Sequence, residues 1–303
     1  MNTRVLCNYE TSFWLDGGDS GSPVFLWWWF YGVDTVELVG LLWGSDDTNH
    51  IAFVSPWPNV ELDLGTLDEV FKPRFQAITT SGARDVGVGA NGAVWIVSDV
   101  SAGNGNYEVK KLVTPTLVGL EAWSASYAPA TRIAVDPSGF PWIVNAAGYI
   151  YRWLGSSWQL MPGGASDIGI GANGTVWVIG TDGLTYRWNG SSWTYIPGSG
   201  VRIAVDPAGN AWVVNGSYQI YRYVSGAFQQ IPGGATDIGV SPDGMVWITG
   251  TLGASDGYEI KWWTGASTGL PWVTVPGHAT AITADRGGTP WVANAFQQLF
   301  RSF

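Results

Sequence analysis

Charged residues of alternating sign recur at one position of a repeated segment. An Asp precedes Val-Gly-Val or Ile-Gly-Ile in some copies, and an Arg precedes Ile-Ala-Val-Asp in others. A carboxylate and a guanidinium attract each other when they are held close together. The sequence therefore predicts a partly closed ring of charged side chains near one mouth of a central channel. Its members are Asp85, Arg132, Asp167, Arg202 and Asp237, and Ala281 interrupts it at the sixth position. Separate salt bridges at strand ends, each contributing little stability, are the alternative.

A second pattern places a basic residue between aromatic residues. Tyr151-Arg152-Trp153 and Tyr186-Arg187-Trp188 are its clearest forms. Strand alternation puts the basic residue on one face and its aromatic neighbours on the other. Packing between neighbouring repeats, with the cation reaching solvent or a carboxylate, competes with a ligand-binding role. The basic residues assigned to this register are Lys110, Arg152, Arg187, Arg222, Lys261 and Arg301.

Short strands and tight turns must position these side chains. Residues 167–200 contain four runs rich in β-branched and aromatic residues, separated by turn signals with Gly or Asn. They predict an antiparallel four-stranded meander, which needs neighbours of its own kind to cover both faces.

A tryptophan in the second strand of this meander marks its copies. The spacings between successive copies are 47, 35, 35, 35 and 44 residues, at Trp95, Trp142, Trp177, Trp212, Trp247 and Trp291. A period of 35 with two insertions is typical of a repeat array, and four-stranded units of this length predict an all-β, six-bladed β-propeller. The six tryptophans could be exposed stacking platforms, but packing between blades is the favoured interpretation.

The last blade lacks a fourth strand within the repeat, because the sequence ends at Phe303. Residues 75–78 (Phe-Gln-Ala-Ile) match 228–231 (Phe-Gln-Gln-Ile), and each run is followed by a segment that begins a new blade. We therefore expect residues 75–78 to supply the outer strand of blade six. Such closure removes an exposed sheet edge.

The repeated unit resembles the tectonin repeat of tectonins, tachylectin-type lectins and fish-egg lectins. The matching signature is Gly174-Thr-Val-Trp-Val-Ile179 followed by Gly183-Leu-Thr-Tyr-Arg-Trp188, and the resemblance covers residues 75–303. It implies a propeller that binds glycans or cell-surface polysaccharide at repeated sites. Candidate residues for carbohydrate are the six basic residues, the six second-strand tryptophans, Trp153 and Trp188.

Residues 1–70 do not share the repeat. They contain Gly18-Asp19-Ser20-Gly21-Ser22-Pro23 and then Val39-Gly40-Leu41-Leu42-Trp43-Gly44. This pair resembles the C-terminal part of trypsin-like serine peptidases and implies a partial chymotrypsin-like β-barrel segment before the propeller at 71–303. The resemblance implies that Ser20 is the nucleophile position, that the Gly18 and Ser20 N–H groups form an oxyanion hole, and that Asp19 pairs with a processed N-terminus.

The residues needed to activate Ser20 are missing from the expected places. A serine nucleophile needs a base and a group that orients the base. In this family His and Asp precede the serine, but no His occurs among the first 19 residues, and His50 and His278 both follow Ser20. We expect this segment to be an inactive remnant.

Composition excludes several classes of function. The net charge is −10 with scattered basic residues, which does not fit a nucleic-acid-binding protein. The longest apolar run, Val24–Tyr31, is too short to span a bilayer, and residues 1–7 do not resemble a signal peptide. No metal cluster or phosphate loop stands out, so we expect neither metal nor cofactor. An extracellular or cell-surface location follows from the family resemblance alone.

Three functions remain open. The favoured one is a multivalent glycan-binding propeller that carries an inactive peptidase remnant. The second is the C-terminal part of a secreted trypsin-like endopeptidase that docks on surfaces through the propeller. The third is a scaffold propeller that binds protein.

Overall fold

The structure is a computed structural model and describes residues 23–30, 33–46, 51–56, 75–114, 122–124, 127–265 and 271–302. The chain divides into two compact units, Met1–Lys72 and Pro73–Phe303. All regular elements in the described ranges are β-strands, so the expected all-β class is confirmed. No described helix is long and apolar enough to cross a membrane.

The described part of the first unit is a three-stranded antiparallel sheet in the order β1-β2-β3. Its strands are β1 (Pro23–Phe30), β2 (Val33–Asp46) and β3 (Ile51–Pro56). The sequence Val39–Gly44 lies within β2. The partial chymotrypsin-like barrel remains a prediction, because three strands do not define a barrel.

The second unit is built from antiparallel strands that follow one another along the chain. They are β4 (Phe75–Val88), β5 (Val94–Gly103), β6 (Asn106–Thr114), β7 (Ala122–Trp123), β8 (Pro129–Ala130), β9 (Arg132–Val135), β10 (Pro141–Val144), β11 (Tyr149–Trp153), β12 (Trp158–Ile170), β13 (Val176–Gly180), β14 (Leu184–Trp188), β15 (Trp193–Ser199), β16 (Arg202–Val205), β17 (Ala211–Val214), β18 (Gln219–Val224), β19 (Ala227–Gly234), β20 (Asp237–Val240), β21 (Val246–Ala254), β22 (Gly257–Trp263), β23 (Trp272–Ala279), β24 (Ala281–Ala284), β25 (Pro290–Ala293) and β26 (Gln298–Ser302).

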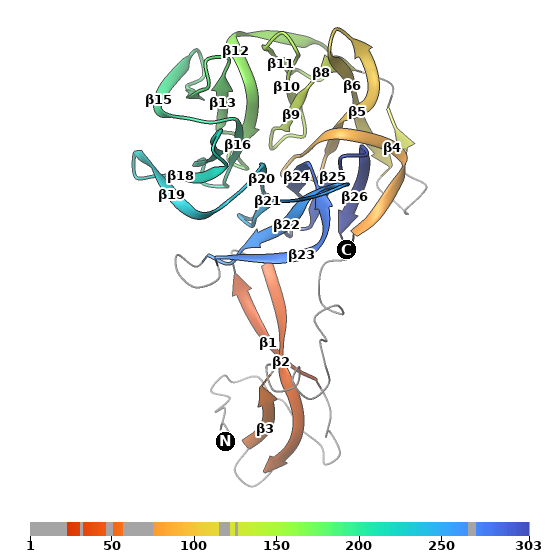
Figure 1. Ribbon diagram of the computed structural model, residues 1–303, viewed down its shortest axis with the longest axis vertical. Coiled ribbons are helices and arrows are strands. Elements are labelled where there is room, and N and C mark those ends of the chain that lie inside the picture. Colours follow the sequence, from red (N-terminus) through yellow and green to blue (C-terminus); the bar gives the residue numbers. More distant parts are fainter. Residues whose placement is uncertain are drawn as a thin grey trace. The chain divides into compact units, whose positions relative to one another are not determined.

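These strands form the meanders of a β-propeller (Figure 1). Blade 4 is β16–β19 and blade 5 is β20–β23. The seven-stranded sheet is two blades that share the long strand β12, whose first half closes blade 2 and whose second half opens blade 3. Strand β4 joins blade 6 to blade 1 in the same way, so six successive blades can be followed in the described residues.

The ring closes through the strand that the sequence predicts. In β4, Phe75 lies opposite Ser302, and Ile78 lies opposite Leu299 of β26. Ile78 and Leu299 are both buried in one apolar cluster with Ala83 of blade 1. The first strand of this unit therefore supplies the outer strand of its last blade (Figure 1).

The core lies between blades. One cluster joins Trp142 of blade 2 to Ile168 and Val178 of blade 3, and another joins Trp177 of blade 3 to Ile203 and Val213 of blade 4. Each blade therefore buries both faces against its neighbours, which is the reason that a single meander would not be stable alone.

Candidate functional site

The first strands of the blades surround a small central cavity. Its volume is about 70 Å³, and its walls come from β4, β9, β12, β16, β20 and β24. Small residues let these strands approach: a Cβ at Gly239 would lie 2.6 Å from the carbonyl oxygen of Ile282 in the next blade. A sugar-sized pocket holds about 300 Å³ or more, so this cavity suits a few waters or a small group.

Three aspartates connect blades at one mouth of this cavity. Asp85 Oδ2 accepts a hydrogen bond from the backbone N–H of Ile133 at 3.0 Å. Asp167 and Asp237 make the same bond to the next blade at 2.8 Å and 2.9 Å, from Ile203 and Ile282. The side chains at the start of odd-numbered blades are therefore bound to the even-numbered blade that follows.

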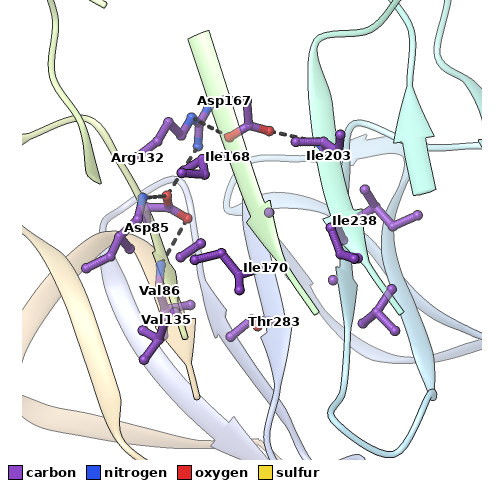
Figure 2. Close-up of a pocket in the computed structure, with 18 of the residues that line it drawn as sticks. Asp85, Val86, Arg132, Val135, Asp167, Ile168, Ile170, Ile203, Ile238 and Thr283 are labelled. Carbon is purple, nitrogen blue, oxygen red and sulfur yellow. Dashed lines mark hydrogen bonds and ion pairs between the residues drawn. The ribbon is translucent and has the colours of Figure 1, made fainter. Parts of the chain in front are cut away.

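Of the two arginines of the predicted ring, Arg132 lies between two of these carboxylates and Arg202 lies beside the third. Figure 2 shows Arg132 between Asp85 and Asp167, with nitrogen–oxygen distances of 4.0 Å and 3.8 Å. Arg202 Nε lies 3.4 Å from Asp237. Arg202 is not among the residues that line the cavity, whereas Asp85, Arg132, Asp167 and Asp237 are.

Burial makes two of the carboxylates difficult to ionise. Burial raises the pKa of Asp85 to about 7, against the attraction of Arg132 and with the added repulsion of Asp237 and Asp167. Burial also raises the pKa of Asp237 to about 6, against the attraction of Arg202 and Arg132. Two guanidinium groups therefore do not fully compensate the charge at this mouth.

The six second-strand tryptophans are wrongly assigned as carbohydrate platforms. The exposed fractions of their side chains lie between 0 and 4 %, so no ring face is free to stack on a sugar. The six residues are Trp95, Trp142, Trp177, Trp212, Trp247 and Trp291. The physical reason is that the pleat directs this position into the gap between two blades. The favoured packing role is what the structure shows.

The indole N–H groups follow the alternation of blades. Trp177 Nε1 donates to the carbonyl oxygen of Gly209 in the next blade at 3.0 Å. Trp95 and Trp247 donate in the same way to Gly139 and Gly288. By contrast, the buried Nε1 of Trp212 in blade 4 has no hydrogen-bond partner among the described residues. Odd-to-even boundaries are therefore linked by two repeated hydrogen bonds, one from an aspartate and one from a tryptophan.

Four arginines of the basic register lie over the tryptophan of their own blade. The distances from the guanidinium carbon to the indole centroid are 5.3, 6.0, 5.1 and 5.2 Å for Arg152, Arg187, Arg222 and Arg301. Arg222 and Arg301 also pair with Asp206 and Asp285 at 2.9 Å and 3.1 Å. Arg187 is exposed and has no carboxylate partner among the described residues.

The predicted register is wrong for the two lysines. Lys111, not Lys110, lies opposite Trp95, and Trp262, not Lys261, lies opposite Trp247. The long hairpins of blades 1 and 5 contain bulges that shift the pairing. Lys110 and Lys261 instead pair with Glu108 and Glu259 at 3.3 Å and 2.7 Å.

Trp153 and Trp188 are half-buried and belong to aromatic pairs near the outer strands. Trp153 lies 5.2 Å from Trp158, and Trp188 lies 5.0 Å from Trp193, centroid to centroid. Trp193 Nε1 also donates to the carbonyl oxygen of Pro162 in the preceding blade. Trp153 and Trp188 therefore contribute to packing between the third and fourth strands of their blades, and part of each side chain is still accessible.

Sequence reasoning missed an exposed aromatic residue in, or directly after, the turn between the second and third strands of each even-numbered blade. These are Tyr149, Tyr218 and Phe296, with exposed fractions of 52, 53 and 62 %. Each turn starts with an asparagine whose side-chain oxygen accepts two backbone N–H groups; Asn215, for example, accepts from Ser217 and Gln219. The sequence signal for these turns was an asparagine three residues after the tryptophan of each even-numbered blade. These asparagines are Asn145, Asn215 and Asn294.

Gly18, Asp19 and Ser20 lie outside the described residues. Their assignment as oxyanion hole, N-terminal partner and vestigial nucleophile therefore remains a prediction. Among the described residues, no group of three or more His, Cys, Asp or Glu is arranged to hold a metal ion.

Comparison with known proteins supports the interpretation of the repeats. The tectonin domain family matches residues 164–303, from the end of blade 2 to the C-terminus, which is less than half of the chain. No curated protein sequence matches. The tectonin assignment is therefore supported for blades 3 to 6, and the peptidase resemblance of residues 1–70 is not.

Solved structures are similar in fold. A putative gluconolactonase shares 14 % identity over 78 % of this chain and 96 % of that chain, with a TM-score of 0.52. The WD40 β-propeller domain of Doa1 shares 11 % identity over 76 % and 97 %, with a TM-score of 0.48. YCF48 bound to D1 peptide shares 16 % identity over 76 % and 82 %, with a TM-score of 0.45. Identities this low carry no inference about ligand or activity.

Proposed function

We propose that the protein is a multivalent glycan-binding module whose ligands contact the second-to-third-strand turns of blades 2, 4 and 6. The observation that carries the proposal is the repeated exposure of Tyr149, Tyr218 and Phe296. An exposed aromatic ring can stack on the apolar C–H face of a pyranose, and amide side chains beside it can bond sugar hydroxyls. Two glutamines supply such amides: Gln219 is next to Tyr218, and Gln298 is two residues after Phe296.

The backbone at Tyr218 gives separate support. Its φ is +64°, in the left-handed region that non-glycine residues rarely adopt, and Gly148 and Gln297 at the equivalent turn positions of blades 2 and 6 have φ +83° and +65°. A tyrosine at such a position costs stability, and its side chain is 53 % exposed. An exposed ring at this position fits a contact with a ligand.

Repetition would supply the affinity. A single stacked sugar binds weakly, but three equivalent turns on one ring can engage a polyvalent surface together, and the effective concentration of the second and third contacts raises the overall affinity. Arg187 and Trp188 remain secondary candidates, because the Arg187 side chain is exposed and free of a carboxylate partner among the described residues. Arg222 and Arg301 are held by their carboxylates.

The test is a glycan array with the full chain, including O-methylated sugars and lipopolysaccharide. We expect a defined set of hits, weakened by Tyr218→Ala and weakened much more when Tyr149 and Phe296 are also replaced by Ala. Phe140→Ala is the matched control, since Phe140 is 38 % exposed but follows a turn at the opposite end of its blade. Binding that depends equally on Phe140, or silence from folded protein, would overturn the proposal.

Two rival functions have distinct signatures. A scaffold would pull down a specific protein while the array stays silent. A surface-docking peptidase would need a coding frame that extends upstream and carries His and Asp at the family positions.

A further inference from the structure

The ring of charge at the cavity mouth has one gap. Each ring arginine lies beside the aspartate of the following blade: Arg132 beside Asp167 at 3.8 Å, and Arg202 beside Asp237 at 3.4 Å. The sixth position is Ala281, so the aspartate that follows it around the ring, Asp85, has no guanidinium from the preceding blade.

Asp85 therefore differs from the other two ring aspartates. Its guanidinium contact is the 4.0 Å approach of Arg132, which also lies beside Asp167. Its Oδ1 accepts a bond from the neighbouring Val86 N–H, and its Oδ2 accepts one from Ile133. The ionised ring would contain three carboxylates and two guanidinium groups, which leaves one negative charge uncompensated at a partly buried site.

Space and access exist beside the Asp85 and Asp237 side chains, which flank Ala281 in the ring. The cavity of about 70 Å³ is lined by Asp85 and Asp237, and the Asp85 side chain is 14 % exposed. The ring lies at the same end of the blades as the exposed aromatic turns, because Ala281 pairs with Ala293, the residue before Asn294. A group that enters the mouth would pass close to these turns.

We propose that this mouth binds a single ammonium group, seated in the cavity between Asp85 and Asp237, and that the group completes the alternation of charge. An ammonium is compact and presents up to three N–H donors, which suits a small cavity with carboxylate oxygens. The described residues offer no cluster for a metal ion, which favours a hydrogen-bonding cation. The ammonium can belong to a free small amine or to a lysine side chain of a protein partner.

The experiment titrates the full chain with methylammonium chloride at pH 8, replacing sodium chloride so that ionic strength stays constant, and follows binding by ligand-observed NMR. We expect saturable binding that weakens about tenfold or more in Asp85→Asn, because a charge-assisted hydrogen bond is lost. Ala281→Arg, which supplies the missing guanidinium, should also abolish binding and raise the melting temperature. Asp99→Asn removes an exposed carboxylate from blade 1 and should bind like the unchanged protein.

The same assay identifies the source of the ammonium. A short lysine peptide that binds more tightly than methylammonium, and that loses binding when the lysine is acetylated, indicates a protein partner. Equal affinity for both indicates a free amine. The proposal is overturned if the unchanged protein shows no saturable binding, or if folded Asp85→Asn protein binds as well as the unchanged protein. Asp85→Asn is a conservative change, because the amide oxygen can still accept a hydrogen bond from the Ile133 N–H. The proposal can therefore be tested with this variant even if Ala281→Arg does not fold.

Discussion

The Asp167 carboxylate accepts a hydrogen bond from the backbone N–H of Ile203 at 2.8 Å, across the boundary between blades 3 and 4. The same relationship recurs between blades 1 and 2 and between blades 5 and 6. The propeller is therefore built from three pairs of blades, and the side chains that define each pair lie at the mouth of the central cavity.

Replacement of Asp167 by Ala should destabilise the propeller by about 1–3 kcal/mol, because the buried Ile203 N–H loses its acceptor. Asp167→Asn should cost less, since the amide oxygen can still accept this bond. Chemical denaturation measures both values. Asp99→Ala, at an exposed position, should stay within about 0.5 kcal/mol of the unchanged protein. Equal effects of Ala and Asn at Asp167 would show that the hydrogen bond is not what stabilises the boundary.

Trp177→Phe should destabilise the protein more than Trp212→Phe. Both indoles are buried, with exposed fractions of 0 and 1 %, so the loss of packing should be similar. Trp177 Nε1 donates to Gly209, whereas the Nε1 of Trp212 finds no hydrogen-bond partner in the part of the chain that the structure describes. The difference should be about 1 kcal/mol, the net contribution of one hydrogen bond. Urea denaturation of the two variants measures it, and the reverse order would contradict the assignment of the blade pairs.

The stability of the fold should depend on pH through Asp85. Its pKa is raised from 3.8 to about 7, so the folded state keeps a proton that the unfolded chain releases. The contribution of this group to stability is therefore present below about pH 4 and is lost as pH rises towards 7. Asp237, with a pKa raised to about 6, acts in the same direction.

Asp85→Asn isolates the contribution of Asp85. The variant should match the unchanged protein at pH 4 and be more stable than it at pH 8, because the amide does not ionise. Thermal melting of both proteins from pH 4 to pH 8 gives the comparison. A difference in melting temperature that is constant across this range would show that Asp85 ionises as easily in the folded state as in the unfolded chain.

The sequence by itself determined the repeated architecture. Turn residues and β-branched runs are local signals for strands and turns. The 35-residue spacing of Trp142, Trp177, Trp212 and Trp247 shows that these signals recur as a repeat array. The closing strand could be predicted for the same reason, since residues 75–78 copy the fourth-strand sequence of another blade. Each of these inferences compares one segment of the sequence with another. None depends on how deeply a residue is buried or on how much a strand twists.

Only the tertiary structure decided which side chains meet. The bond from Asp167 to Ile203 joins residues 36 positions apart, and the bond from Asp237 to Ile282 joins residues 45 apart. Such contacts depend on how closely neighbouring blades approach, which a strand pattern does not encode. Bulges in the long hairpins moved Lys110 and Lys261 out of the predicted register. The positive φ of Tyr218 and the exposure of its side chain also follow from the geometry of its turn, which the hydrophobic pattern of the strands does not specify.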